Sequence, residues 1–154
     1  MGYGYGVWLV LQDFPVFKLI ERHNIKPHTS HITVMCNMDF LSAKSLAEEL
    51  HGIYRVTVNN RYKWFCSEND KYSKSDDTLA ASGFICSVNK WKHIINIAKK
   101  YDGDIPKIPH LSVVYRDDES GLPIHIETTF LRTTALIFAA DINSDKPHEW
   151  CLFD

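Results

Sequence analysis

The sequence predicts a single α+β (α/β) domain over residues 1–154, in which two pseudo-symmetric lobes of antiparallel sheet carry helices on their outer faces. Three observations predict this architecture. The chain has the length of one domain, which buries roughly two-thirds of its unfolded surface. Apolar runs of strand length alternate with segments of helical period. Finally, the order strand, helix, proline, strand occurs twice, once from Gly6 to His31 and once from Gly83 to His110.

The first half predicts a strand, a helix and a second strand. The apolar run at 6–11 has the length of a strand. Asp13 suits the N-cap of a helix and Pro15 suits its first turn, and Pro27 lies beyond its end. The run HITVM at 31–35 then predicts the second strand.

A second helix is predicted directly after this strand. Ser42 is its expected N-cap, and Gly52 is expected to end it. Its apolar residues follow the spacing i, i+3, i+4 and i+7 of one helical face: Ala43, Leu46, Ala47 and Leu50.

The middle of the chain predicts a hairpin and a loop. The runs at 54–58 and 61–66 have strand composition, and the asparagines between them suit a tight turn. The polar segment 67–77 shows no periodicity, which indicates a loop.

The second half repeats the order of the first. The run at 81–88 predicts a strand, Asn89 is the expected N-cap of a helix, and prolines precede a strand at 110–115. The helix has four apolar residues on one face: Trp91, Ile94, Ile95 and Ala98. Two more strands, at 123–130 and 133–142, are expected to complete the chain.

Composition restricts the class of ligand and the compartment. The net charge of −2 does not fit a protein that grips long RNA or DNA, because such proteins have strongly basic faces. No apolar run approaches about 18 residues, and no basic segment precedes the apolar N-terminal run, so neither a membrane span nor a signal peptide is expected. The four cysteines form no C-x-x-C pair, which indicates reduced thiols and a cytoplasmic location.

Two short motifs occupy equivalent places in the repeated halves. They are His31-Ile-Thr33 and His110-Leu-Ser112, each within an apolar run. Residues i and i+2 of a strand share a face, so each histidine should point the same way as its hydroxyl partner. About one such His-x-Ser/Thr match is expected by chance in this chain. The two motifs indicate a site because they occupy equivalent positions in the repeated halves.

This pair of motifs resembles that of the two-histidine (2H) phosphoesterase superfamily. That superfamily includes RNA ligase-like cyclic phosphodiesterases, 2′-5′ oligoadenylate phosphodiesterases and compact viral enzymes that destroy cyclic oligonucleotide signals. The resemblance implies that His31 and His110 are the catalytic pair and that Thr33 and Ser112 bind the phosphate. Histidine suits both proton transfers because it ionises near neutral pH.

The implied function is cleavage of a small nucleotide phosphodiester without a metal or another cofactor. The expected substrate is a cyclic di- or oligonucleotide, or a 2′-5′ oligoadenylate, and a role as a viral immune antagonist follows from the resemblance alone. Two alternatives stay open. One is a phosphodiesterase for 2′,3′-cyclic nucleotides or RNA ends, and the other is a nucleotide-binding module without turnover. The sequence leaves the oligomeric state open.

Three aromatic residues are candidates for stacking on a nucleobase: Tyr5, Trp64 and Trp150. Trp150 lies in a polar C-terminal segment and is a candidate lid over the histidines. The pair His28 and His31 has the spacing H-x-x-H, but a strand places these residues on opposite faces, so no metal site is expected.

Overall fold

The computed structural model describes five ranges of the chain: 3–12, 29–65, 81–115, 131–144 and 146–153. Within them, only the backbone is described at 60–65, 81–82, 113–115, 131 and 147. Three predicted elements lie outside the described residues, namely the helix that begins at Asp13, the loop 67–77 and the strand 123–130.

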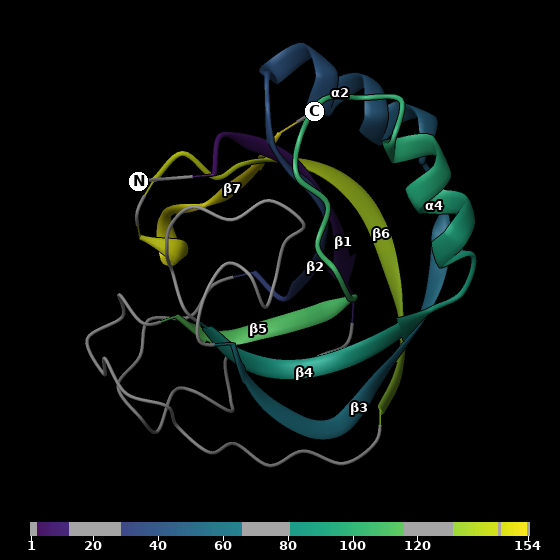
Figure 1. Ribbon diagram of the computed structural model, residues 1–154, viewed down its shortest axis with the longest axis vertical. Helices are drawn as coiled ribbons and strands as arrows, with labels where there is room; N and C mark the ends of the chain where they lie inside the picture. Colours follow the sequence, from purple (N-terminus) through teal and green to yellow (C-terminus); the bar gives the residue numbers. More distant parts are fainter. Residues whose placement is uncertain (1–2, 13–28, 66–80, 116–130, 145, 154) are drawn as a thin grey trace.

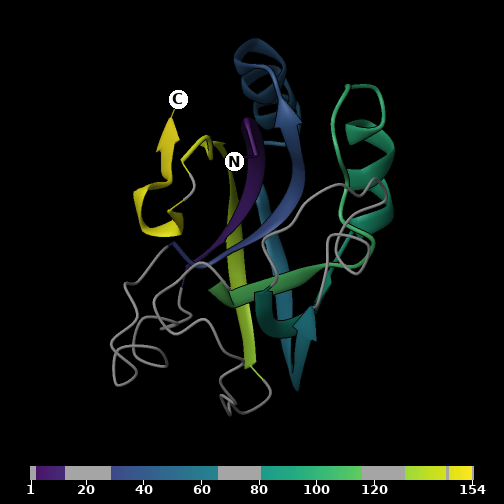
Figure 2. The ribbon, with the colours of Figure 1, turned by 60° about the vertical axis from the view of Figure 1, so that its left-hand side comes forward.

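Seven antiparallel strands form one sheet (Figures 1 and 2). The sheet order is β1-β2-β5-β4-β3-β6-β7, and β1 also pairs with β6. The β1–β6 pairing closes the strands β1 to β6 into an antiparallel barrel. β7 lies outside this barrel and pairs with β6. The strands are β1 (Tyr5–Leu11), β2 (His31–Met38), β3 (Ile53–Phe65), β4 (Ala81–Val88), β5 (His110–Tyr115), β6 (Leu131–Asp141) and β7 (Cys151–Phe153).

The predicted α+β fold of two separate lobes is therefore wrong. The main reason is β6, whose residues pair with β1 from Leu11↔Ala135 to Tyr5↔Asp141 and with β3 from Val58↔Leu131 to Ile53↔Leu136. One long strand thus lies between β1 and β3 and closes the sheet. The repeated order of elements does not include β6, so the repeat alone could not indicate that the sheet closes.

The described residues contain two short α-helices, both at predicted places. They are α2 (Phe40–Glu49) and α4 (Trp91–Ala98), which lie together on one side of the barrel in Figure 1. Their caps differ from the prediction. Asp39 caps α2 by accepting a hydrogen bond from the Ser42 backbone N–H at 2.7 Å. At α4 the cap residue is Lys90, in the left-handed region at φ 62°, while the Asn89 side chain binds the backbone of β3. A 3-10 helix, η1 (Pro147–Glu149), precedes β7.

The predicted hairpin at 54–66 is also wrong, because β3 continues through it. β4 is the partner on both sides of the expected turn, with Val58 opposite Cys86 and Tyr62 opposite Phe84. The register shifts between these two pairs, so the two asparagines fall in an irregular stretch of one strand. Such a bulge accommodates extra residues without reversing the chain.

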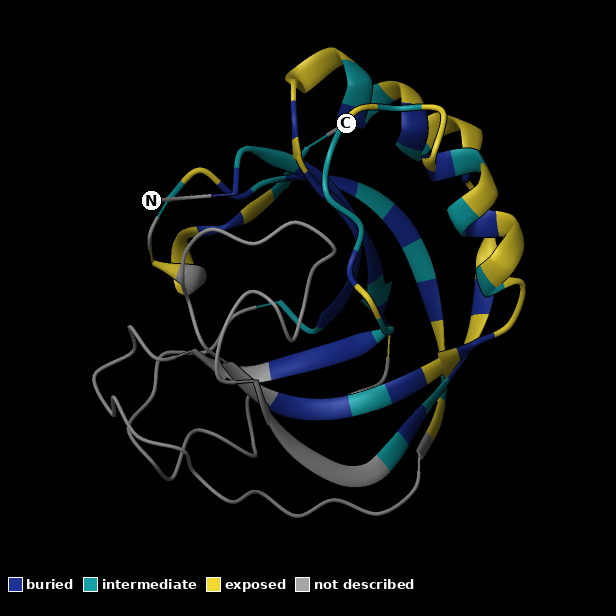
Figure 3. Ribbon diagram, in the orientation of Figure 1, coloured by how far each residue is buried: buried dark blue, intermediate teal, exposed yellow. Residues whose placement is uncertain are grey.

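Two apolar clusters lie on opposite faces of β1. The larger cluster includes residues of all six barrel strands and the buried residues of both helices, whereas the smaller cluster gathers around Trp8 and Trp150. Figure 3 shows an alternation of buried and half-buried residues along β6. Period-2 burial of this kind is what one packed face of a strand requires. No helix in the described ranges is long and apolar enough to cross a membrane.

The cysteines of β4 and β7 should differ in reactivity. Cys86 is buried, and its desolvation raises the pKa of its thiol to about 12, whereas Cys151 is exposed. Only the thiolate reacts with alkylating agents. At pH 8 we expect iodoacetamide to label Cys151 in the native protein and to leave Cys86 unlabelled, as read from peptide masses. Equal labelling of the two residues in the folded protein would contradict the packing of β4.

Candidate active site

The two histidine motifs lie on neighbouring strands. β2 and β5 pair antiparallel, with Ile32 opposite Leu111, and both of these residues belong to the larger apolar cluster. The residues on either side of them therefore point to the opposite face. This register places each histidine opposite the hydroxyl residue of the other motif: His31 opposite Ser112, and His110 opposite Thr33. The expectation that each histidine shares a face with its hydroxyl partner is confirmed, and the four side chains form one group.

The two imidazoles are diagonal neighbours in this group. His31 is opposite Ser112, which lies two residues from His110 on the same strand. Diagonal neighbours on adjacent antiparallel strands are about 7–8 Å apart. The histidines thus lie on one face of the sheet and close to one another.

The outer strands extend the group into two rows across the sheet. One row runs from β1 through β2 and β5 to β4 as Trp8, Thr33, His110 and Ile85. The second row runs through the same strands as Val10, His31, Ser112 and Gly83. Each histidine therefore has a hydroxyl residue on one side and an apolar residue of an outer strand on the other.

The two rings are held by equivalent hydrogen bonds. His31 Nδ1 is 2.7 Å from the Thr29 carbonyl oxygen, and His110 Nδ1 is 2.9 Å from the Ile108 carbonyl oxygen. A carbonyl only accepts, so Nδ1 carries the proton in both rings. In the neutral form of either histidine the lone pair is then on Nε2. The structure thus assigns the same tautomer to both histidines and makes Nε2 the atom that gains or loses a proton.

Aromatic rings pack against His31 from two directions. The Trp8 ring is stacked on the imidazole, with ring centroids 3.6 Å apart and planes 13° apart. Trp150 meets the imidazole edge-on at 6.0 Å, and its Nε1–H donates to the Ser144 carbonyl oxygen at 2.8 Å. These contacts leave the His31 ring little freedom to turn.

The group is enclosed. His31, His110 and Ser112 are each 3% exposed, and Thr33 is 8% exposed. Polar groups removed from bulk water interact more strongly with a charge placed between them, because the surrounding dielectric is low.

The structure separates the three aromatic candidates. Trp150 contacts His31 edge-on, and its role as a cover over the histidines stays a prediction. Tyr5 is on the other face of β1, where its ring packs edge-on against Phe40 and Phe153, so it is not brought to the histidines. The side chain of Trp64 lies outside the described part of the chain.

Trp8 is the residue that sequence reasoning missed. In the run at 6–11 it reads as one more core residue, although strand alternation places it on the face opposite Val7 and Leu9. Its Nε1–H is buried and has no hydrogen-bond partner in the described part of the structure. Buried indole N–H groups normally have an acceptor, so this one is a candidate donor to a bound ligand.

Trp8 should be tested by two substitutions. Trp8→Ala removes the ring stacked on His31 and should lower the free energy of unfolding by about 3–5 kcal/mol. Trp8→Phe keeps an aromatic ring in place and removes only the N–H donor, so it should lose a fraction of that stability. Urea denaturation measures both. Equal losses for the two variants would show that the ring stack contributes nothing to the fold.

No group of three or more histidine, cysteine or acidic residues in the described ranges is arranged to hold a metal ion. His28, the partner of His31 in the H-x-x-H spacing, lies outside those ranges. Independence from metals therefore stays a prediction.

No protein-family model, curated protein or solved structure matches this chain. The resemblance to the 2H phosphoesterase superfamily accordingly remains a prediction from the two motifs.

Proposed function

We propose that this protein is a 2H-type phosphodiesterase that cleaves a small nucleotide by general acid–base catalysis, with His31 and His110 as the two proton-transfer groups and without a metal. One observation carries the proposal. Two imidazoles of the same tautomer are diagonal neighbours on one sheet face, and each is beside a hydroxyl residue of the other motif. A spacing of about 7–8 Å between their positions leaves room for one phosphate between the rings.

The reaction needs one neutral and one protonated imidazole. Nε2 of the neutral ring takes the proton of the incoming oxygen, which belongs to water or to a neighbouring ribose hydroxyl, while that oxygen forms a bond to phosphorus. Nε2 of the protonated ring gives its proton to the departing oxygen as the old P–O bond breaks. Each such transfer contributes about 10²–10⁴-fold to the rate. Which histidine is the acid depends on the direction in which the substrate lies.

Thr33 and Ser112 are proposed to bind the phosphate. Each lies opposite a histidine across the β2–β5 pair, so its hydroxyl is close to the space between the rings. These hydroxyls donate to the non-bridging oxygens, whose negative charge grows as the incoming oxygen attacks. Donors that are already in place in an enclosed site need no reorganisation during the reaction.

The preferred substrate is a cyclic di- or oligonucleotide or a 2′-5′ oligoadenylate. The net charge of −2 supports a small ligand over long nucleic acid. A cytoplasmic location and a role in removing an immune signal belong to the same proposal. They rest on the cysteine pattern and on the resemblance, respectively.

A substrate panel in the presence of EDTA tests the proposal. The purified protein is incubated with cyclic dinucleotides, 2′-5′ oligoadenylate and 2′,3′-cyclic monophosphates, and the products are separated by chromatography. We expect product to form linearly with time and with a bell-shaped pH profile, as one acid and one base require. Product from the 2′,3′-cyclic compounds alone would favour the RNA-end alternative. Saturable binding without any product would favour the binding module, and loss of activity with EDTA would overturn metal independence.

A further inference from the structure

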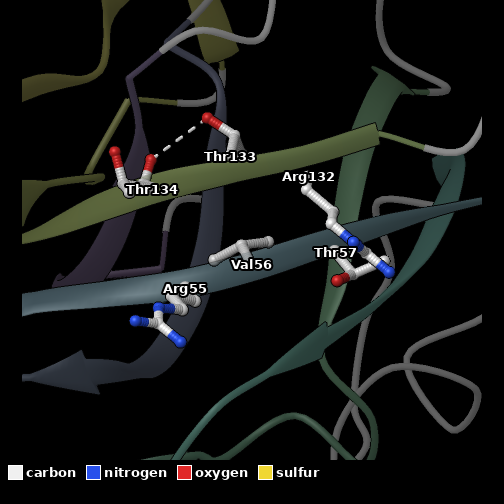
Figure 4. Close-up of a pocket in the computed structure, with 6 residues that line it drawn as sticks. All are labelled: Arg55, Val56, Thr57, Arg132, Thr133 and Thr134. Carbon is white, nitrogen blue, oxygen red and sulfur yellow. Dashed lines mark hydrogen bonds between the residues drawn. The ribbon is translucent and has the colours of Figure 1, made fainter.

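A groove lies over β3 and β6, the two barrel strands that are not neighbours of β2 or β5. Its cavity volume is about 550 Å³. We call it the β3–β6 groove, and its lining residues, drawn in Figure 4, are Arg55, Val56, Thr57, Arg132, Thr133 and Thr134.

The strand register pairs each arginine of this groove with a threonine. Arg55 is opposite Thr134, and Arg132 is opposite Thr57. In Figure 4 the Arg132 side chain extends from β6 across to Thr57 on β3. The two arginines are diagonal neighbours, so their positions on the two strands are about 7–8 Å apart.

The backbone under the groove is firmly held. The Arg55 backbone N–H donates to the Asn89 side-chain oxygen at 2.7 Å, and the Asn89 backbone N–H donates to the Arg55 carbonyl at 3.0 Å. Val56 is buried in the larger apolar cluster, so the residues on either side of it point to the opposite face. The Thr133 hydroxyl donates to the Thr134 carbonyl oxygen and is therefore engaged within the strand (Figure 4).

The groove concentrates positive charge in a chain whose net charge is −2. Arg55 and Arg132 are the only arginines whose side chains the structure describes, and both are exposed. Among the lining residues that the structure describes, none is acidic. The guanidinium group binds phosphate oxygens through two parallel hydrogen bonds, and hydroxyl groups add further donors.

We propose that the β3–β6 groove binds a small molecule with two linked phosphate groups, such as pyrophosphate or a nucleoside diphosphate. Two guanidinium groups at this spacing can each bind one of two adjacent phosphates. The cavity volume also falls within the range of about 300–1,000 Å³ found for small-molecule sites. The groove is separated from the histidines by one intervening strand on each side, β1 and β4. It is therefore a second site, and it does not depend on the proposed phosphodiesterase activity.

Calorimetric titration of the full chain with pyrophosphate and with ADP tests this site. We expect saturable binding in the groove and about tenfold or greater weakening of that binding in Arg55→Gln/Arg132→Gln. The charge-matched control is Lys92→Gln/Lys146→Gln, which alters two exposed lysines elsewhere and should bind as the unaltered protein does. Thermal unfolding confirms that both variants are folded. A third variant, Arg55→Lys/Arg132→Lys, keeps the charge, loses the planar fork and should also bind more weakly.

In these titrations, any one of three results would overturn the site: no saturable binding at millimolar ligand, equal weakening in Arg55→Gln/Arg132→Gln and in the control Lys92→Gln/Lys146→Gln, or equal affinity for orthophosphate and pyrophosphate. The variant His31→Ala/His110→Ala separates this proposal from the previous one. Unchanged pyrophosphate binding in that variant supports the groove. Loss of binding there would assign the ligand to the histidine site and overturn the groove alone.

Discussion

Alanine at His31 or at His110 should lower the rate of phosphodiester cleavage by about 10²–10⁴-fold. Each substitution removes one of the two Nε2 atoms through which protons enter and leave the reaction. His31→Ala also removes the ring that stacks on Trp8 and meets Trp150 edge-on, so the stability of this variant must be measured beside its activity. Substitution by glutamine keeps a polar side chain of similar length but cannot transfer a proton at neutral pH, and it should lose activity to a similar degree.

The double variant adds a sharper test of the pairing. When two residues act as one unit, the loss caused by removing both is close to the loss caused by removing either. We therefore expect the cleavage rate of His31→Ala/His110→Ala to be close to that of the less active single variant. Full turnover by either single variant, or two losses that simply multiply, would contradict a shared acid–base mechanism.

Alanine at Gly83 should damage the site from the neighbouring strand. A Cβ atom at this position would lie 1.9 Å from the Leu111 carbonyl oxygen and 3.0 Å from Ser112 Cα. Both are backbone atoms of β5 within the second motif, so β5 must move away from β4 to admit one methyl group. Overpacking of this kind lowers the free energy of unfolding by about 1–3 kcal/mol. Displacing His110 and Ser112 should also reduce catalysis, because misplacement by about 1 Å can lower a rate about 10²-fold.

Ser87→Ala is the matched control for Gly83→Ala. It is on the same strand, but its side chain is exposed, so stability should change by no more than about 0.5 kcal/mol. Denaturation curves and turnover numbers for the two variants give the comparison. A Gly83→Ala protein as stable and as active as Ser87→Ala would mean that β4 and β5 are not as close as the structure places them.

The spacing of apolar residues along the chain was sufficient to predict the helices and strands whose buried face depends on local periodicity. The spacing of Ala43 and Leu46 places the buried face of α2, and alternation around Ile32 separates the core side of β2 from the histidine side. The pairing of strands that are distant in the sequence could not be predicted from this spacing. The closure of the barrel depends on β6 pairing with two distant strands, and no local signal distinguishes such a strand from one at the edge of a lobe.

The candidate site shows the same division. The i, i+2 spacing within each motif predicts that histidine and hydroxyl share a face, whereas the adjacency of β2 and β5 is a property of the sheet order. Trp8 was missed because an apolar strand does not reveal which of its residues face a functional group. Tyr5 is three positions from Trp8, an odd spacing that puts it on the opposite face.

The most direct test asks whether both imidazoles contact one anion. The protein is labelled with ¹⁵N-histidine in the Arg55→Gln/Arg132→Gln background, so that the β3–β6 groove does not compete, and is titrated with orthophosphate. We predict that the Nε2 resonances of His31 and His110 shift together with a single dissociation constant, while those of the exposed His51 and His93 stay unchanged. A response from only one of the two buried histidines, from neither, or with two different constants would contradict the shared site.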